Sequence, residues 1–234
     1  MSKKFLLTSA LCFCLSVPAI AFAASDREDD VHRLGTSTDV FREIMNTPDK
    51  GIPHRLLESA KCIAIIPGDK KFAFVFGGNY GRGVATCRTA KGWSAPMFVA
   101  IEGGSVGYQI GGSSTDIVML FMNDHALQSL LGDKFKLGGD ASVAAGPVGR
   151  DAAADTDIRL RAEILTYSRS HGIFAGVSLD GTVVQADSSG DHAMYGDNTT
   201  RRQIVDGRVP VPNSARALIR EIDSRSAQAR AGSY

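Results

Sequence analysis

The sequence has few cysteines and histidines and almost no net charge, and therefore lacks the features typical of a metalloprotein, a redox enzyme or a strongly charged binding protein. Its 234 residues include four cysteines, one tryptophan and five histidines, and 26 basic residues nearly balance 25 acidic ones. A charge near zero exerts no long-range pull on nucleic acid, so any such binding needs a local patch. The histidines stand singly, without the spacing of a metal site. We therefore expect no metal, no cofactor and no nucleic-acid partner.

Long apolar runs are also scarce, and the one clear case lies at the N-terminus. Lys3 and Lys4 precede an apolar stretch from Phe5 to about Ile20, and Ala21-Phe22-Ala23 follows it. This order is typical of a secretory signal peptide over residues 1–23, cut after Ala23. An uncleaved anchor is the alternative, although about 16 apolar residues are few for a spanning helix of about 20. We expect an exported protein, periplasmic or extracellular, with 24 basic and 25 acidic residues after cleavage.

Only two cysteines, Cys62 and Cys87, lie beyond this segment. Export would carry them to an oxidising compartment, where disulfides persist. Both lie in sequence typical of β-strands, so neighbouring strands could bring them within bonding distance. The sequence therefore predicts a Cys62–Cys87 disulfide, with two separate buried thiols as the alternative.

The first predicted elements are helical. A polar leader over residues 24–37 precedes Val40, Phe41, Ile44 and Met45, which recur at helical spacing with Ser37 or Thr38 available as an N-cap. A second helix is predicted over 53–61, with proline in its first turn. Further helices are predicted at 124–131 and 214–222, with a helical turn at 188–195 and a flexible tail over 223–234.

Between these helices the sequence pattern becomes typical of β-strands. Short apolar or alternating runs separated by turn residues predict strands at 63–66, 72–76, 83–87, 97–101, 106–110, 117–121, 158–160, 162–167, 172–178 and 182–185. Closely spaced strands pair antiparallel, and the 25 glycines would permit tight bends. We expect one α+β domain over 38–222, built on a strongly curved antiparallel sheet or small barrel with N-terminal helices and a C-terminal helix.

One motif suggests catalysis. Gly103-Gly104-Ser105-Val106-Gly107 matches the G-x-S-x-G pattern of serine hydrolases, with Asp116, His125 and His171 as nominal partners. A nucleophile elbow passes from strand to helix, whereas the residues after Gly107 resemble another strand. A hydrolase at Ser105 is therefore a minor alternative, and we expect no enzymatic activity.

A basic and aromatic cluster suggests lipid binding instead. Four cations lie near the ends of the first predicted strands, interleaved with phenylalanines: Lys70, Lys71, Arg82 and Arg88, with Phe72 and Phe74. Lysine or arginine could contact a lipid phosphate while a phenylalanine touches acyl chain. The alternative is an ordinary solvated edge of the sheet.

Several motifs in fixed order resemble the SYLF lipid-binding domain family. They include Cys62-Ile63-Ala64-Ile65-Ile66-Pro67, Phe76-Gly77-Gly78-Asn79-Tyr80-Gly81-Arg82-Gly83, Gly92-Trp93-Ser94-Ala95-Pro96 and the stretch from Tyr167 to Gly181. The resemblance covers roughly residues 38–205. It implies a non-catalytic domain that binds lipid. Eukaryotic relatives act at membranes and bind phosphoinositides, and the fungal ones bind and bundle actin.

The expected partner follows from how this chain differs from those relatives. A signal peptide and the lack of an SH3 or FYVE module make actin an unlikely partner. The expected ligand is an anionic phospholipid or another lipid of the bacterial cell envelope, bound by a peripherally membrane-associated protein. An N-terminal segment implicated in lipid contact in animal members would correspond loosely to Val40–Met45, which could equally face the core. The main alternative function is a structural or protein-interaction module of the envelope, whose oligomeric state the sequence leaves open.

Overall fold

The computed structural model describes residues 20–48, 51–73, 76–106, 111–148, 162–170 and 179–231. The helices are α1 (Ile20–Met45), α2 (His54–Ser59), α3 (Asp124–Leu131), α4 (Ser188–Tyr195), α5 (Arg201–Val205) and α6 (Arg216–Ala231), with a short 3₁₀ helix, η2 (Asn213–Ala215). The strands are β1 (Cys62–Ala73), β2 (Phe76–Thr89), β3 (Gly92–Trp93), β4 (Met97–Val106), β5 (Gly111–Phe121), β6 (Lys134–Lys136), β7 (Val143–Ala145), β8 (Ile164–Ser170) and β9 (Val183–Ala186).

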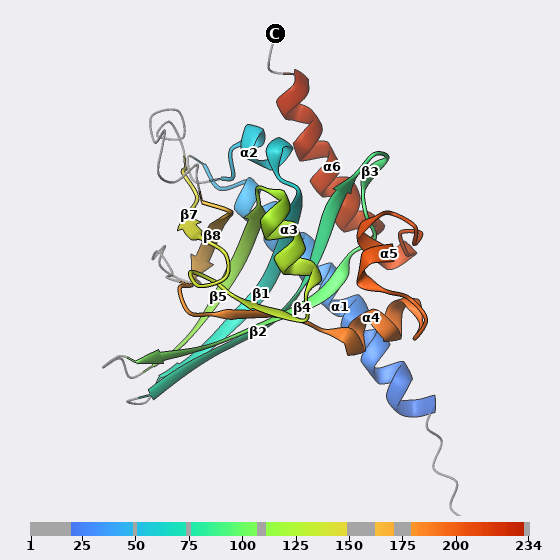
Figure 1. Ribbon diagram of the computed structural model, residues 1–234, viewed down its shortest axis with the longest axis horizontal. Helices are drawn as coiled ribbons and strands as arrows, with labels where there is room; N and C mark the ends of the chain where they lie inside the picture. Colours follow the sequence, from blue (N-terminus) through green and yellow to red (C-terminus); the bar gives the residue numbers. More distant parts are fainter. Residues whose placement is uncertain are drawn as a thin grey trace, which may run out of the picture.

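The described strands form one curled sheet that resembles half of a barrel (Figure 1). Their order is β6-β9-β4-β2-β1-β5-β8-β7, and β3 pairs with β2 beside this path. The pairs are antiparallel except for β7 with β8, so the sheet is mixed. The prediction of an α+β fold with a strongly curved sheet, N-terminal helices and a C-terminal helix is confirmed.

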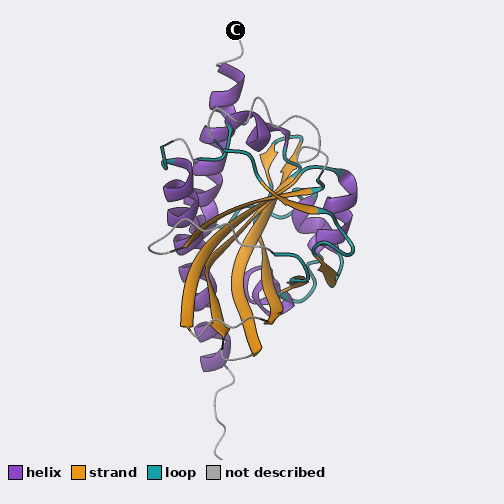
Figure 2. Ribbon diagram, turned by 90° about the vertical axis from the view of Figure 1, so that its left-hand side faces the viewer, coloured by secondary structure: helices purple, strands orange, loops and turns teal. Residues whose placement is uncertain are grey.

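The central part of the sheet is covered by helices on both faces (Figure 2). Along β1, Ile63 and Ile65 pack into one apolar cluster, and Ala64 and Ile66 pack into a second cluster on the opposite face. The first cluster includes residues of α1, α2 and α6, and the second includes residues of α3 and α5. A strand buried on both faces reads as a continuous apolar run rather than an alternating one, which explains the sequence of these strands.

The long strands extend through positions where the sequence predicted breaks. The predicted strand 63–66 lies in β1, whose pairing resumes at Asp69 after an irregularity at Pro67 and Gly68. The predicted strand 72–76 is wrong as one strand, because its first two residues end β1, its last residue begins β2, and residues 74–75 lie outside the described part of the chain. Gly68 has a φ of +58°, a backbone conformation that glycine adopts without strain. Turn residues therefore mark a bulge here and not the end of a strand. The predicted strands 158–160 and 172–178 lie outside the described residues, as does most of 106–110.

The polar leader predicted over residues 24–37 is wrong as a description of local structure, because α1 runs through it. Leu34 is fully buried in the first apolar cluster, and Asp30 and Arg33 form a buried ion pair of 2.8 Å. Thr38, predicted as an N-cap, lies inside the helix and donates its hydroxyl to the carbonyl of Leu34. Tertiary partners on α4 and the sheet hold this polar segment helical, which helical periodicity alone could not reveal.

The other helices follow the sequence more closely. The α3 bounds match the prediction, and the Asn123 side chain accepts a hydrogen bond from the amide of Ala126 as an N-cap. The predicted tail is wrong, since α6 continues to Ala231. The prediction missed α5, although Thr200 and Gln203 form a capping box whose Thr-x-x-Gln pattern is present in the sequence.

Cys62 and Cys87 are directly opposite each other on β1 and β2 and form a disulfide with an S–S distance of 2.08 Å. Both residues are buried in the second apolar cluster. The bridge closes a segment with a sequence separation of 25 residues, which includes most of the β1–β2 hairpin. It therefore ties the two central strands together at the end of the sheet that the helices cover.

Replacing both cysteines by alanine should lower the free energy of unfolding by about 3 kcal/mol, since the cross-link restricts the unfolded chain. Denaturant unfolding of oxidised wild-type protein and the double variant measures this difference. Wild-type protein unfolded under reducing conditions should match the variant. Two titratable thiols in oxidised, denatured wild-type protein would contradict the bridge.

Gly35 tests the helical state of the predicted leader. It is exposed inside α1, and an added Cβ would meet no atom within 4 Å. Gly35→Ala should therefore raise the free energy of unfolding by about 0.5–1 kcal/mol, because alanine has the higher helix propensity. Gly196→Ala is the matched control: the site is equally open, but its φ of +87° disfavours alanine, so stability should fall. No gain for Gly35→Ala would contradict a helix over residues 24–37.

Candidate functional site

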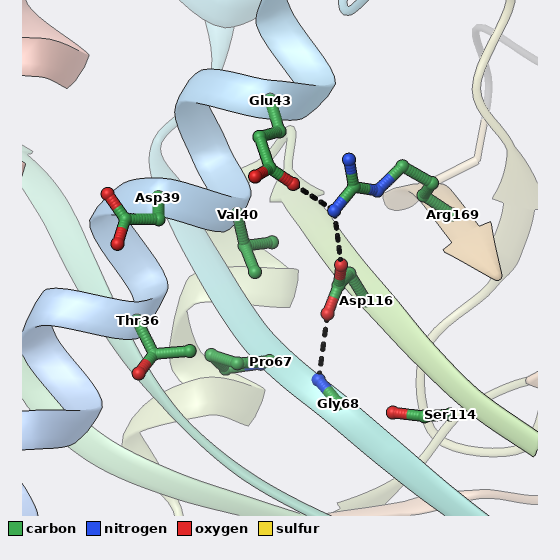
Figure 3. A pocket seen from close by; sticks show the side chains of 9 residues that line it. All are labelled: Thr36, Asp39, Val40, Glu43, Pro67, Gly68, Ser114, Asp116 and Arg169. Carbon is green, nitrogen blue, oxygen red and sulfur yellow. Dashed lines mark hydrogen bonds and ion pairs between the residues drawn. The ribbon is translucent and has the colours of Figure 1, made fainter. Parts of the chain in front are cut away.

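A groove runs between α1 and the sheet at the bulge of β1. It consists of two neighbouring pockets of about 360 Å³ and 290 Å³, which share Thr36 and Pro67 in their walls. Its full lining is Asp29, His32, Arg33, Thr36, Asp39, Val40, Glu43, Pro67, Gly68, Arg82, Ser114, Asp116 and Arg169. We call this feature the α1 groove. Figure 3 shows the larger pocket, where successive turns of α1 face the strands.

Charged groups from three elements meet at the larger pocket (Figure 3). Arg169 of β8 pairs with Glu43 of α1 and, at 2.9 Å, with Asp116 of β5. The other oxygen of Asp116 accepts a hydrogen bond of 2.9 Å from the amide of Gly68 in the β1 bulge. Partial burial opposes charging of Arg169, but the hydrogen bonds with Asp116 and Glu43 outweigh it and raise the pKa of its guanidinium. These contacts fix α1, the bulge and β8 relative to one another.

A second ionic cluster lies behind the smaller pocket. One carboxylate oxygen of Asp187 accepts hydrogen bonds from Arg33 of α1 at 2.8 Å and from Arg82 of β2 at 2.7 Å. Ser189 donates to the other oxygen at 2.6 Å. Burial would raise the pKa of Asp187, but the hydrogen bonds from Ser189, Arg82 and Arg33 prevail and hold it well below the usual range. Asp187 is therefore ionised at neutral pH and joins α1 to the sheet.

In a buried carboxylate on α4, the effect of burial on the pKa outweighs that of the hydrogen bonds. Asp191 accepts a hydrogen bond of 2.7 Å from the amide of Phe98 and pairs with Arg201 at 3.0 Å. Burial raises the pKa of Asp191 to about 6, despite the opposing effect of Arg201. Arg201 also donates to the carbonyl of Phe98, so the contacts join α4 and α5 to β4. This arrangement is structural and lies outside the α1 groove.

The predicted cationic cluster is not a single patch among the described side chains. Arg82 belongs to the cluster around Asp187 and keeps 39% of its side chain exposed. Arg88 stacks on Trp93, with its guanidinium carbon 4.4 Å from the ring centroid, and donates to the carbonyl of Leu57. The backbone of Lys70, Lys71 and Phe72 lies in β1, whereas their side chains and all of Phe74 lie outside the described part of the chain.

Tyr80 is an exposed aromatic side chain that the sequence analysis did not single out. It lies on β2, is 50% exposed, and is directly opposite Lys70 on β1 and Glu102 on β4. Its position in the quoted Phe76–Gly83 motif was visible in the sequence. Its exposure was not, because an aromatic residue in a strand is more often buried.

The apolar side of the predicted amphipathic helix packs inward. Val40, Phe41 and Ile44 are buried in the first apolar cluster, and Met45 packs against it partly buried. These four residues therefore contribute to the core in this conformation and do not form a free apolar face.

The nominal catalytic residues are not brought together among the described residues. Ser105 lies within β4, paired with Gly77, and so is not at a strand-to-helix turn. Asp116 is bonded to Arg169 and Gly68, and His125 contacts Glu163 at 2.7 Å. His171 lies outside the described residues. Within the described ranges, no cluster of three His, Cys, Asp or Glu residues could hold a metal ion, and no helix has the length and apolarity to span a membrane.

Comparison with known proteins identifies relatives of this chain. Residues 102–225 match the family described as "Ysc84: Las17-binding protein actin regulator". The chain is 38% identical to Protein YSC84 of Saccharomyces cerevisiae over 182 residues, 76% of this chain and 39% of that protein. It is 34% identical to SH3 domain-containing YSC84-like protein 1 of Homo sapiens over 188 residues, 79% of this chain and 55% of that protein. It thus spans about two fifths to just over half of these curated relatives.

Asp187→Asn tests the ionic cluster that holds α1. Its lowered pKa means that ionised Asp187 stabilises the fold above about pH 4, and that this contribution is lost as the pH falls further. The variant should lose about 3 kcal/mol at neutral pH and show a shallower fall in stability below about pH 4. Denaturant unfolding at a series of pH values measures both effects. Asp223→Asn, an exposed site on α6, is the control and should leave both nearly unchanged.

Proposed function

The chain belongs to the Ysc84/SYLF family, and from that membership we propose that it is a non-catalytic lipid-binding protein of the bacterial cell envelope. The observation that carries the proposal is the projecting end of the sheet, where β1, β2 and β5 extend beyond the helices (Figure 1). This end holds the exposed Tyr80 and the backbone positions of Lys70, Lys71 and Phe72. Lysine, phenylalanine and tyrosine are residue types that suit the interface between lipid head groups and acyl chains.

The strand register supports this choice of surface. Phe72 is directly opposite Gly78 on β2 and Gly112 on β5, and Ala73 is opposite Gly77 and Gly111. The positions directly across from Phe72 on both neighbouring strands therefore carry glycine and no larger residue. The helices bury the sheet at Ile63–Ile66 and leave Tyr80 half exposed further along. We propose that Lys70, Lys71, Phe72 and Tyr80 contact the lipid.

The proposal also covers the location of the protein in the cell, the absence of catalysis and the class of ligand. The signal-peptide pattern of residues 1–23 motivates an exported, peripherally membrane-associated protein. Family membership and the separate partners of Asp116 and His125 favour binding over catalysis. An exported protein would meet envelope lipids and not actin, so we propose anionic phospholipid as the ligand class. A protein-interaction role is the second candidate, because the matched family is described as binding Las17.

Sedimentation with liposomes tests the proposal. Mature protein, residues 24–234, should bind vesicles that contain anionic phospholipid and should bind less at higher salt, since salt screens exposed charges. Lys70→Glu with Lys71→Glu should reduce the bound fraction about tenfold. Lys134→Glu with Lys136→Glu provides the same charge change on exposed residues of β6, and should change binding little. Tyr80→Ser should weaken binding at all salt concentrations, because it removes aromatic contact.

Two outcomes would count against this function. Equal effects of the two lysine pairs would mean that net charge, and not the sheet end, governs binding. A wild-type protein that binds no vesicle would reject the lipid proposal. Sedimentation with actin filaments in the same experiment would then test the protein-binding candidate that the relatives' description motivates.

A further inference from the structure

The Cys62–Cys87 disulfide lies beneath a cover made of two helices, α3 and α5. Cys62 is fully buried, Cys87 is 1% exposed, and both belong to the second apolar cluster. We infer that this bond is made and broken only while the two helices are undocked, so that a dithiol–disulfide oxidoreductase has to act on the chain before the native structure closes. The inference rests on the burial of the bond and not on the proposed lipid contact, so either can fail alone.

The two helices are joined to each other, and we call the pair the α3–α5 cover. Arg201 of α5 donates a hydrogen bond of 3.3 Å to the carbonyl of Leu130 on α3. Arg202 donates one of 2.9 Å to the side chain of Gln128. We therefore expect the helices to undock together. The side chains that they contribute to the second apolar cluster, which also holds both cysteines, are Ala126, Leu130, Ile204 and Val205.

The α3–α5 cover is attached to the sheet next to both cysteines. Asp124, the first residue of α3, pairs at 3.2 Å with Lys61, which directly precedes the first cysteine. Just after α5, Gly207 lies so close to Thr89 of β2 that an added Cβ would be 3.2 Å from its side chain. Thr89 is two positions after the second cysteine. Undocking of the cover would therefore remove apolar contact from the strand ends that carry the two sulfur atoms.

Thiol–disulfide exchange needs access to a sulfur atom, which the buried bond does not provide. During closure, one cysteine thiolate attacks the disulfide of the oxidoreductase and forms a mixed disulfide with it. The second cysteine thiolate then attacks the sulfur of the first and displaces the sulfur of the oxidoreductase. The chain loses two electrons and two protons, and the oxidoreductase takes them up and leaves as a dithiol. Reduction by a small dithiol reverses these steps and needs the same access.

Reduction of oxidised wild-type protein by dithiothreitol, with alkylation of the released thiols, is the first measurement. The native protein should react about a hundredfold more slowly, or more slowly still, than the protein in denaturant, since it reacts from a rarely populated open state. At low denaturant concentrations the reduction rate should rise less steeply than global unfolding, because undocking of the cover exposes only part of the chain. In the reverse direction, a purified dithiol–disulfide oxidoreductase should oxidise the reduced, folded protein much more slowly than the reduced, unfolded protein.

Two leucine variants test the cover itself. Leu130→Ala removes apolar contact between α3 and the sheet, and should speed reduction of the native protein by at least about tenfold. Leu218→Ala makes the same change on α6, in the apolar cluster on the opposite face, and should leave that rate nearly unchanged. Denaturant unfolding of each variant confirms that it is folded and measures its loss of stability.

Two results would overturn the inference. One is reduction of the native protein at nearly the rate of the unfolded protein, which would mean that the bond is accessible without undocking. The other is a reduction rate that follows global unfolding in the denaturant series, with equal acceleration by the two leucine variants, which would mean that the α3–α5 cover does not control access. The denaturant series on wild-type protein decides this point even if a leucine variant fails to fold.

Discussion

Burial of the central strands on both faces is the constraint on which the rest of this structure depends. Side chains of β1, β2, β4 and β5 alternate between two apolar clusters, so each face of the sheet needs its own cover. The face that carries Ile63 and Ile65 is covered by α1, α2 and α6, and the opposite face by α3 and α5. Apolar burial of this kind supplies most of the free energy that holds helices to a sheet. Where the strands run past the helices, the apolar pattern gives way to glycine and polar residues.

Helix α1 depends on charge as well as on apolar contact. Its C-terminal half packs through Phe41 and Ile44, but its N-terminal half is held by Arg33, which pairs with Asp30 of the same helix and with Asp187. Buried ion pairs add little net stability compared with apolar packing, yet removing one partner is costly. Their effect here is to fix the position of α1 over the sheet. The α1 groove exists because the helix is fixed at these ionic clusters while the β1 bulge passes beneath it.

Two surfaces with different chemistry result from this arrangement. The sheet end presents strands without helix cover, with Tyr80 exposed, and is the surface that we propose contacts lipid. The α1 groove is lined mostly by polar and charged side chains, several of which form ion pairs that join α1 to the sheet. The first depends on the length of the strands, and the second depends on how α1 is held.

The sequence by itself determined the α+β class, the curved sheet, the helix α3 with its Asn123 cap and the family resemblance. Each of these depends on local patterns: apolar runs, turn residues, caps and ordered motifs. It also identified the cysteine pair, because only two cysteines follow the predicted signal peptide. Only the tertiary structure decided the length of α1, the role of Arg88 and the groove. Arg33 meets Asp187 across 154 positions, and Asp116 meets Arg169 across 53. Such contacts have no signature in a single sequence, because they depend on how the sheet curls and where a helix comes to lie on it.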